Sequence, residues 1–394
     1  MITYAEALGL MLDAVSTQGS ESVRLEDAAE RYLAMTVTAA IDAPRCDVSA
    51  MDGYAVRLLD AQNGGWLEII GEAAAGVPFA GDIESGQAVR IFTGAHVPHG
   101  ADCVVIQEEA LREGDRIRCK ERFGPSRHIR AKGSDFEAGA NLLEAGTRLS
   151  PTAMVALAGS DRARVEVARR PTVLVIATGD ELVAPGEAAR TKSSIPESGS
   201  FGVAAMAVQG GASLVGKYSG ADDLGVLEGL AKDAMERSDL VIVIGGASVG
   251  DRDFAKQMFE QFDLSLMFSK VAIKPGKPVW FGTADGKHVL GLPGNPSSAM
   301  VTARLFLAPL LVAMQGGNGY ASVASSSQVM ATDLPPSGMR ETFVRARLDE
   351  DGLRAVINQE SGAQAPLASS DWLIRRAPGD HGIPAGESVP AIPF

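Results

Sequence analysis

The chain has 394 residues, of which 46% are hydrophobic, and this length predicts two to four soluble domains. Its formal net charge of −13 at pH 7 excludes nucleic acid and anionic membranes as favourable partners, because both repel a negative surface. Three cysteines without a C-x-x-C spacing argue against a disulfide framework and a cysteine-rich zinc site, so we expect a cytoplasmic protein.

The N-terminal residues predict an amphipathic helix rather than a signal peptide. The segment lacks a basic start and carries Glu6 and Asp13. Thr3 and Glu6 have the spacing of a capping box. Apolar side chains then recur at helical spacing, at Leu8, Met11, Leu12 and Val15. No apolar run is expected to be long enough to span a bilayer.

Residues 1–170 predict a β-rich N-terminal region made of two parts, one inserted into the other. A second helix is expected near Leu25–Leu33. Short strand-like runs follow, separated by Gly, Pro and Asp. They are Trp66–Ile70, Ala88–Phe92, Cys103–Gln107 and Asp115–Cys119.

Residues 171–317 predict a central, doubly wound parallel α/β domain. The continuous apolar runs Thr172–Thr178 and Leu240–Ile244 are typical of strands buried on both faces. Further strands are expected at Ser213–Tyr218 and His288–Leu292. The expected helices are Gly202–Gln209, one capped by Asp222, one marked by Phe254, Met258 and Phe262, and Pro296–Met314. In such folds ligands bind beyond the carboxyl ends of the strands.

Residues 318–394 return to short strand-like runs, such as Glu341–Arg347, with Gly and Pro turns. They predict a small C-terminal β domain. The fold class is therefore multidomain α/β plus β.

Four loops at strand ends of the α/β domain combine glycines with polar or charged residues. They are residues 177–182 (ATGDEL), 245–253 (GGASVGDRD), 272–278 (AIKPGKP) and 291–298 (GLPGNPSS). In the second loop, backbone N–H groups of Gly245 and Gly246 and the Ser248 hydroxyl can converge on an anion. Alone, this loop would be a tight turn before a helix cap. Its place in a set of four favours phosphate binding.

The third loop holds two ammonium groups, Lys274 and Lys277, on a turn that proline and glycine constrain. This rigidity lowers the entropic cost of placing both at one anion, whereas most lysines lie on solvated surface. Glu181 follows a strand end, where a carboxylate can hold Mg²⁺ or accept a ring N–H, although such residues often serve solubility alone. Asn295 and Pro296 fit the cap and first position of a helix.

Three segments of the N-terminal region are simple turns when each is taken alone. They are residues 49–56 (SAMDGYAV), 91–95 (IFTGA) and 133–135 (GSD). The five histidines show no ligand spacing, and the chain has no nucleophile elbow or Walker loop.

Six motifs in one order resemble a known family. SAMDGYAV, IFTGA, TGDEL, GGASVGDRD, AIKPGKP and GLPGNP closely resemble the MoeA family of molybdopterin molybdenumtransferases, to which the E domain of gephyrin belongs. RETFVRARL at Arg340–Leu348 resembles the start of that family's C-terminal domain, so the resemblance covers nearly the whole chain. It implies that the central domain is of the molybdopterin-binding type.

The resemblance also implies an activity and an assembly. The expected reaction is a Mg²⁺-dependent transfer that inserts molybdate into adenylyl-molybdopterin and releases AMP, in molybdenum cofactor biosynthesis. The expected assembly is an elongated four-domain homodimer, whose active cleft lies between the α/β domain of one subunit and N-terminal segments of the other. Transient contact with other cofactor-assembly or acceptor proteins is a further expectation.

The resemblance assigns roles to the residues that match its motifs. The expected catalytic residues are Asp52, Thr93, Asp135, Glu181, Asp253, Lys274 and Lys277. The residues expected to bind the pterin nucleotide are Thr178, Gly179, Asp180, Gly245, Gly246, Ser248, Gly250, Pro293, Gly294 and Asn295. The expected Mg²⁺ ligands are Glu181, Asp251 and Asp253.

The sequence departs from the family's usual pattern at several positions. Glu197 and Gly199 replace the ends of a D-[ST]-N segment, Ile244 replaces Ser or Thr, Ser134 replaces Glu, and Gln364-Ala365-Pro366 replaces a Q-x-S-H-like stretch. These changes keep open a divergent pterin-binding or scaffold paralogue with weak or no activity. A nucleotide pyrophosphatase is a second alternative, although the D-G-Y-A and T-G-A segments argue against it.

Overall fold

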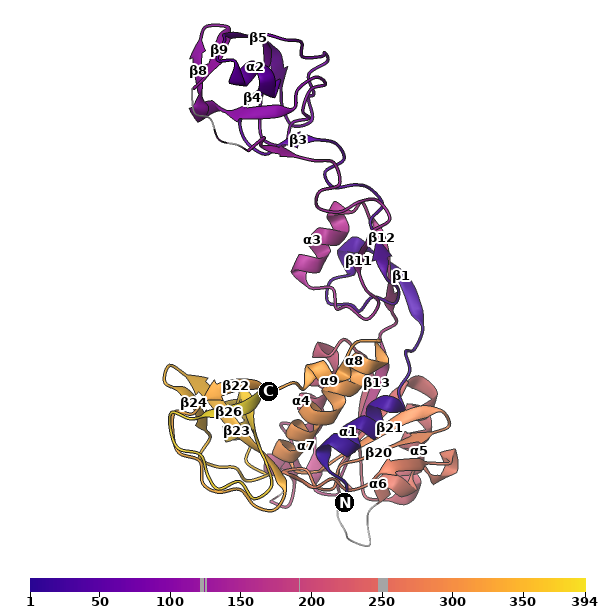
Figure 1. The fold of residues 1–394 in the computed structure, drawn as a ribbon. Coiled ribbons are helices and arrows are strands. Elements are labelled where there is room, and N and C mark those ends of the chain that lie inside the picture. Colours follow the sequence, from indigo (N-terminus) through magenta and orange to yellow (C-terminus); the bar gives the residue numbers. More distant parts are fainter. Residues whose placement is uncertain (121–123, 125, 191, 247–253) are drawn as a thin grey trace.

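A computed structural model describes residues 1–394 except 121–123, 125, 191 and 247–253. The molecule is elongated (Figure 1), because the N-terminal region extends away from the α/β domain. The C-terminal β domain lies beside the α/β domain. The expected combination of a β-rich N-terminal region, a central α/β domain and a C-terminal β domain is confirmed.

The inner part of the N-terminal region pairs strands that lie far apart in the sequence. β1 pairs with β12 and β2 with β11, both antiparallel, beside helix α3. The elements are β1 (Ser20–Arg24), β2 (Val37–Thr38), β11 (Asn141–Leu143), α3 (Pro151–Gly159) and β12 (Arg164–Ala168). The chain between β2 and β11 forms the outer part.

The prediction of a helix near Leu25–Leu33 is wrong. Only a 3-10 turn, Leu25–Asp27, forms. Glu30 takes a left-handed backbone conformation with φ of 66°, which an α-helix cannot accommodate. The chain then turns back to bridge Leu33 to Val167 of β12.

The outer part is built on a six-stranded sheet in the order β7-β4-β6-β5-β9-β8. A separate pair, β3 with β10, joins it to the inner part. The elements are β3 (Val48–Ser49), β4 (Gly53–Val56), α2 (Leu58–Gln62), β5 (Leu67–Ala73), β6 (Gln87–Ile91), β7 (Cys103–Ile106), a 3-10 turn (Gln107–Glu109), β8 (Ala110–Glu113), β9 (Arg116–Cys119) and β10 (Ile129–Arg130). Cys103 and Cys119 are buried in its core, and burial raises the pKa of each thiol to about 11.

The sheet of the α/β domain has the order β16-β13-β17-β21-β20-β18. Its strands are β13 (Thr172–Thr178), β16 (Ser213–Gly220), β17 (Leu240–Ile244), β18 (Ser265–Phe268), β20 (Trp280–Ala284) and β21 (Lys287–Leu292). The first four in this order are parallel, as expected. β20 is antiparallel to both of its neighbours, β21 and β18, so the sheet is mixed. Asp285 and Gly286 join β20 to β21 with positive φ values of 44° and 72°, the geometry of a tight hairpin turn.

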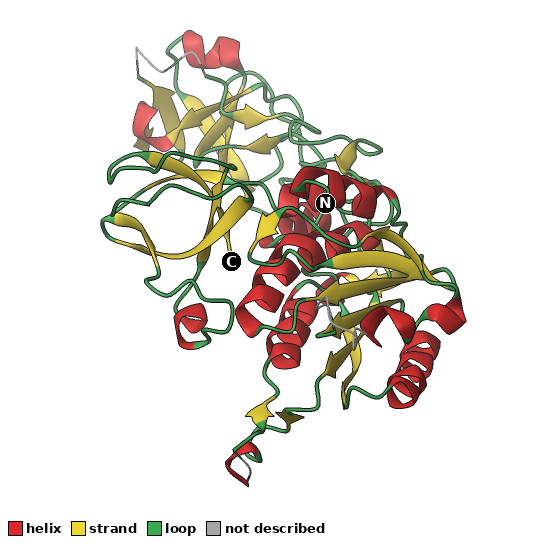
Figure 2. Ribbon diagram, turned by 90° about the horizontal axis from the view of Figure 1, so that it is seen from below, coloured by secondary structure: helices red, strands yellow, loops and turns green. Residues whose placement is uncertain are grey.

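Helices cover both faces of this sheet (Figure 2), which confirms the doubly wound architecture. Val173 and Val175 of β13 face α1, α4 and the long helix Pro296–Met314, whereas Leu174 and Ile176 face α5 and α6. The helices are α1 (Tyr4–Asp13), α4 (Gly199–Gln209), α5 (Leu224–Arg237), α6 (Phe254–Gln257) and α9 (Gly319–Ser322), with 3-10 turns at Ala188–Arg190 and Glu260–Phe262. A small ladder pairs β14 (Leu182–Val183) with β15 (Ile195–Pro196).

The N-terminal helix belongs to the core of the α/β domain. The expected capping box is confirmed, because the Thr3 side chain accepts from the Glu6 N–H and the Glu6 carboxylate accepts from the Thr3 N–H. The buried face includes Leu8 and Met11, although the helix ends before Val15. Asp223, not the expected Asp222, caps α5.

The long helix is continuous from Pro296 to Met314, as α7 (Pro296–Thr302), a π-turn (Ala303–Leu307) and α8 (Ala308–Met314). The expectation that no apolar run could span a membrane is wrong for this helix, which has 19 residues and a mean hydropathy of 1.6. However, 72% of its apolar window is buried inside the protein, as in the core helix of a globular domain.

The C-terminal domain is a sheet in the order β19-β23-β25-β26-β22, with β24 paired to β23. Its elements are β22 (Ser326–Val329), β23 (Glu341–Asp349), β24 (Gly352–Ala355), α10 (Ala365–Ala368), β25 (Trp372–Arg376) and β26 (Ser388–Pro393). The edge strand β19 (Ile273–Lys274) comes from the α/β domain and pairs in parallel with β23. One of the expected functional lysines is therefore held by the C-terminal sheet.

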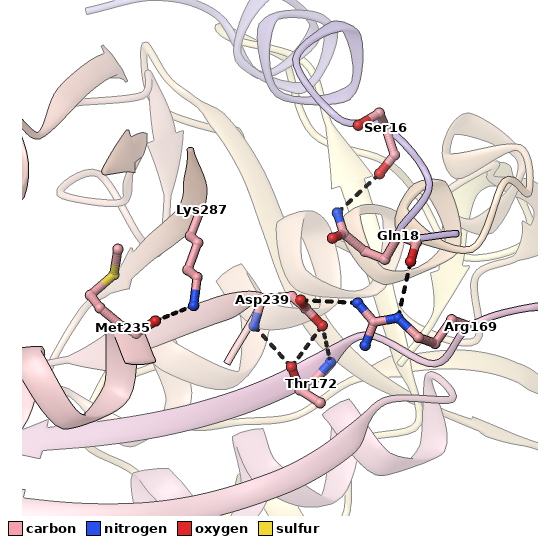
Figure 3. A network of polar contacts seen from close by, with 7 residues as sticks. All are labelled: Ser16, Gln18, Arg169, Thr172, Met235, Asp239 and Lys287. Carbon is pink, nitrogen blue, oxygen red and sulfur yellow. Dashed lines mark hydrogen bonds and ion pairs between the residues drawn. The ribbon is translucent and has the colours of Figure 1, made fainter. Parts of the chain in front are cut away.

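A polar network fixes the two segments that join the N-terminal region to the α/β domain (Figure 3). Arg169 donates to the carbonyl of Gln18 at 3.0 Å and pairs with Asp239 at 3.2 Å. Asp239 also accepts hydrogen bonds from the N–H and hydroxyl of Thr172 at 2.8 and 2.6 Å. Burial alone would raise the pKa of Asp239, but these hydrogen bonds outweigh it and the pKa lies below its ordinary value.

We expect Asp239→Asn to lower the free energy of unfolding by about 2 kcal/mol at pH 7, because buried donors lose a charged acceptor. Since the pKa of Asp239 is lowered by folding, its contribution is fully present above the unfolded pKa of about 3.9 and is lost as the pH falls through the folded value. The gap between wild type and variant should therefore shrink below about pH 4. Urea unfolding across pH tests this, with the exposed Glu236→Gln as control; an unchanged gap would contradict it.

Candidate functional site

The first cavity lies where the expected loops meet. It has a volume of about 760 Å³ and opens at the carboxyl ends of β13, β17 and β21. Parallel strands place their carboxyl ends at one edge, so three of the four predicted loops converge there. The expected pterin-nucleotide and catalytic residues that line it are Thr178, Gly179, Glu181, Gly245, Gly246, Pro293, Gly294 and Asn295.

Two glycines after β17 are required by close packing. Gly245 and Gly246 have φ values of 106° and 56°, in the left-handed region that L side chains disfavour. A Cβ on Gly245 would lie 2.6 Å from the carbonyl oxygen of Thr178. However, the N–H of Gly245 already donates to the carbonyl of Leu292 at 3.2 Å. This amide joins strand ends rather than facing an anion, which corrects the expected role of its N–H group.

The Thr178 hydroxyl is a buried polar group beside the first cavity, and it lacks a partner among the described residues. Thr178 ends β13 and is 6% exposed, and its Oγ1 has no hydrogen-bond partner among the described residues. Buried hydroxyls are nearly always satisfied, and an unsatisfied one costs about 1–3 kcal/mol.

Carboxylates, rather than cations, give the first cavity its charge. Glu181, Glu197 and Asp222 line it, and its described lining contains no Lys, Arg, His or Cys. Such a surface accepts hydrogen bonds from ring N–H groups and disfavours bare anions. In the part of the chain that the structure describes, no group of three His, Cys, Asp or Glu side chains is arranged to hold a metal.

Two of the acidic residues have local structural partners. Glu197 is 7% exposed, and its carboxylate accepts from the N–H of Ser200 at 2.7 Å in the first turn of α4. Asp180 is exposed outside the cavity and accepts from the N–H of Asp222 at 2.9 Å. Asp180 therefore holds the segment before α5, and its expected role in binding the pterin nucleotide stays a prediction.

The second cavity, of about 1260 Å³, lies between the third loop and the C-terminal domain. Lys274 and Lys277 line it, and both side chains are exposed. Arg340 joins them from the C-terminal domain, against the carboxylates Asp333 and Glu360, while Arg376 in the same lining is paired with Asp380 at 2.6 Å. Cations therefore outnumber carboxylates in this lining, within a chain whose net charge is −13.

The two cavities are neighbours that share a wall. Pro278 of the third loop and Gly362 of the C-terminal domain line both. Gln364 reaches the first cavity from the same C-terminal segment. A ligand with a polar ring and an anionic tail could occupy both cavities at once.

The structure does not bring the expected N-terminal residues to these cavities within one chain. Asp52 accepts from the N–H and hydroxyl of Thr93, both at 2.8 Å, in the outer part of the N-terminal region. Hydrogen bonds from Thr93 lower the pKa of Asp52. Asp135 is exposed beside the segment that joins the two parts. All three lie in the part of the chain that Figure 1 shows extending away from the α/β domain.

Several expected residues lie outside the described part of the chain. They are Ser248, Gly250, Asp251 and Asp253. Their roles in phosphate or metal binding stay predictions.

Sequence reasoning missed the contribution of the C-terminal domain. Arg340, Arg376 and the segment around Gly362 line the cavities although they follow the α/β domain by many residues. A Ser-Gly pair at Ser361-Gly362 was the one local signal of a turn. Ile244, Glu197 and Gly199, noted as departures, all line the first cavity.

Comparison with known proteins finds family matches along nearly the whole chain. The MoeA N-terminal region (domain I and II) matches residues 2–160, the domain described as "Probable molybdopterin binding domain" matches 174–313, and the MoeA C-terminal region (domain IV) matches 328–394. Molybdopterin molybdenumtransferases of Haemophilus influenzae and Nostoc sp. are 35% and 34% identical to it. These alignments cover 100% and 95% of this chain and 99% and 88% of the relatives.

A solved structure agrees with the sequence comparison. The crystal structure of the molybdopterin biosynthesis moeA protein from Pyrococcus horikoshii OT3 superposes with a TM-score of 0.87 at 27% identity, covering 100% of both chains. The Haemophilus influenzae relative and this structure both align with 100% of the chain, across all three regions. The chain therefore belongs to the MoeA family.

Proposed function

We propose that this protein is a molybdopterin molybdenumtransferase, which inserts molybdate into adenylyl-molybdopterin and releases AMP in molybdenum cofactor biosynthesis. Relatives named molybdopterin molybdenumtransferase, aligned over 99% and 88% of their own length, support the assignment. The observation that carries it in this chain is the pair of adjoining cavities, one lined by carboxylates and the other by cations.

The charges suggest how the substrates divide between the cavities. The pterin ring presents N–H donors, and these suit the carboxylates of Glu181 and Asp222. Molybdate and the phosphoanhydride are anions, and these suit Lys274 and Lys277. The lysines would neutralise charge on the oxyanions as the anhydride is cleaved, which is stabilisation of the transition state by fixed charges.

Mg²⁺ fits the donor chemistry of the first cavity. Its described lining offers carboxylate and hydroxyl oxygens without His or Cys, and Mg²⁺ prefers oxygen ligands. Glu181 would hold the ion together with Asp251 and Asp253. Bound there, Mg²⁺ would offset the negative charge of this lining and supply Lewis-acid polarisation to a phosphate oxygen that enters the first cavity.

Asp52, Thr93 and Asp135 are proposed to complete the cleft from the second subunit of a homodimer. Support comes from their distance from both cavities along one extended chain (Figure 1). The Asp52–Thr93 hydrogen bonds already fix one acceptor and one hydroxyl together. The chain is proposed to act in the cytoplasm, with transient contacts to cofactor-assembly or acceptor proteins and none to nucleic acid or membrane.

Mixing two inactive variants tests the shared cleft. We expect Asp52→Asn and Lys274→Ala each to be inactive as homodimers, whereas refolded mixtures should recover about a quarter of wild-type activity, because half of randomly formed dimers carry one intact cleft. AMP release per chain measures the recovery. Mixing Asp52→Asn with Thr93→Ala is the control. Both changes lie in the N-terminal segments, so each cleft of a mixed dimer would carry one defect and no cleft would be intact. Failure of the first mixture to recover would contradict a cleft built by two subunits.

The proposed reaction is tested with purified protein, adenylyl-molybdopterin and Mg²⁺, with and without molybdate. AMP release should depend on molybdate, and the product should activate a molybdenum-free acceptor enzyme. Asp253→Ala should lose both readouts. Equal AMP release without molybdate and without molybdenum incorporation would favour a nucleotide pyrophosphatase, and pterin binding without turnover would favour a scaffold paralogue.

A further inference from the structure

Arg345 is a buried cation in β23 of the C-terminal domain. The residue is 1% exposed, although it carries a full charge. It forms no ion pair among the described residues, and burial lowers the pKa of its guanidinium. Arginine still remains protonated at neutral pH, so this charge must be stabilised by neutral acceptors.

The acceptors all belong to one loop and one helix start. The Arg345 Nη2 donates to the carbonyls of Asn358 and Glu360, both at 3.0 Å. Its Nη1 donates to the carbonyl of Ala363 at 3.2 Å and to the Ser297 hydroxyl oxygen at 2.8 Å. Residues 358–363 therefore wrap around a single guanidinium, which also reaches the α/β domain.

The same loop is attached directly to the start of α7. The Ser297 N–H donates to the carbonyl of Ser361 at 3.0 Å, and the Ser297 hydroxyl donates to the carbonyl of Ala363 at 2.6 Å. The Asn295 side-chain amide donates to the Ser361 hydroxyl at 3.0 Å. The loop and the GLPGNPSS motif thus form one hydrogen-bonded unit with Arg345 beneath it.

This unit forms the wall between the two cavities. Gly362 lines both of them, while Gln364 faces the first, and Asn358 and Glu360 face the second. The distance from the polar ring site to the lysines therefore depends on where residues 358–364 lie. Asn295, an expected ligand-binding residue, is held by the same loop.

We propose that Arg345 is a positioning residue for the reaction: it gathers residues 358–364 around its guanidinium and fastens them to Ser297, and so sets the wall that both substrate cavities share. The proposal rests on the proposed function for its kinetic consequence, but not for its structural one. Lysine cannot replace the arginine, because one ammonium cannot direct two parallel pairs of donors at four acceptors.

Arg345→Lys, Ser297→Ala and the control Arg347→Lys separate positioning from folding. Arg347 lies two residues away on the same strand but is exposed. We expect Arg345→Lys to raise the KM for adenylyl-molybdopterin about 10-fold while kcat changes less than about threefold, because the wall is displaced and the reacting groups remain. Ser297→Ala should shift KM in the same direction, and Arg347→Lys should match wild type.

Hydrogen exchange on the full-length proteins without substrate supplies the second readout. Amides of residues 358–364 should exchange at least about 10-fold faster in Arg345→Lys, whereas amides of the β13 core should not change. Faster exchange without any wild-type turnover would leave the wall assignment standing and defeat the proposed function. An active wild type with unchanged KM and unchanged exchange in both Arg345→Lys and Ser297→Ala would overturn the positioning role.

Discussion

Lys274→Ala is expected to lower kcat/KM for molybdate insertion by about 100-fold to 1000-fold, which is the usual effect of removing one preorganised charge from a developing oxyanion. Lys274 is exposed to the second cavity and has no carboxylate partner among the described residues, so its charge is available to a ligand. Its backbone is held by pairing with Thr342 of β23. The substitution therefore removes the side-chain charge, and we expect the backbone pairing and the fold to be kept.

Two further variants make this result specific. Lys274→Arg keeps the charge and should retain more activity than alanine, although the different fork geometry will prevent full recovery. Lys232→Ala removes an exposed lysine from α5 and should leave kcat/KM unchanged. Initial rates of AMP release at several molybdate concentrations give the comparison. A Lys274→Ala enzyme within about threefold of wild type would remove this lysine from the mechanism.

The sequence was sufficient to predict the convergence of the strand-end loops. Thr172–Thr178 and Leu240–Ile244 are continuous apolar runs, and such runs pair as neighbouring parallel strands. Once these strands are parallel, the residues that follow them must lie at one edge of the sheet. Thr178, Glu181 and Gly245 therefore line one cavity without any contact having been known in advance.

Hydrogen bonding between distant segments was not predictable in the same way. Nothing local to Gly245 indicates that its N–H will donate to Leu292, or that the Asp180 carboxylate will accept from Asp222. Both bonds depend on the register of neighbouring strands and the path of the next connection. Residue type and spacing thus identified where the site lies better than what each polar group does there.

The wall that residues 358–364 form between the two cavities was not predictable from the sequence, for a related reason. Arg345 and Ser297 are 48 residues apart, and neither has a local feature that indicates the other. A buried arginine in a strand is indistinguishable by sequence from the exposed Arg347 of the same strand. The antiparallel strand β20 had a local signal, the Asp285-Gly286 pair between apolar runs, which is typical of a hairpin, but the prediction of a parallel domain did not use it.

The sequence-based interpretation of GLPGNP also assigned Gly291 to a ligand loop, whereas the structure assigns it to packing. Gly291 lies inside β21, directly opposite Trp280 of β20. A Cβ on Gly291 would lie 1.9 Å from the indole Nε1 and Cε2 atoms. Trp280 is fully buried, so its ring cannot swing out into solvent. The glycine is needed because the indole occupies the volume of its missing side chain.

Gly291→Ala should therefore destabilise the α/β domain by about 3 kcal/mol or more, the upper end of the range for overpacking a core. The matched control is Gly229→Ala in α5 of the same domain, where a Cβ would meet nothing within 4 Å. That substitution should instead stabilise by about 1 kcal/mol, through the higher helix propensity of alanine. Urea unfolding followed by circular dichroism compares the two.

Removing the Trp280 ring should remove the destabilisation that Gly291→Ala causes. Trp280→Leu alone leaves a cavity and should cost about 3 kcal/mol, but in the Gly291→Ala background the added methyl would occupy part of the vacated volume. The Trp280 Nε1 has no hydrogen-bond partner among the described residues, so its loss strands no acceptor. The double variant should then be about as stable as Trp280→Leu, with a coupling of roughly 3 kcal/mol between the two positions. Additive losses would show that Gly291 is constrained by something other than the indole.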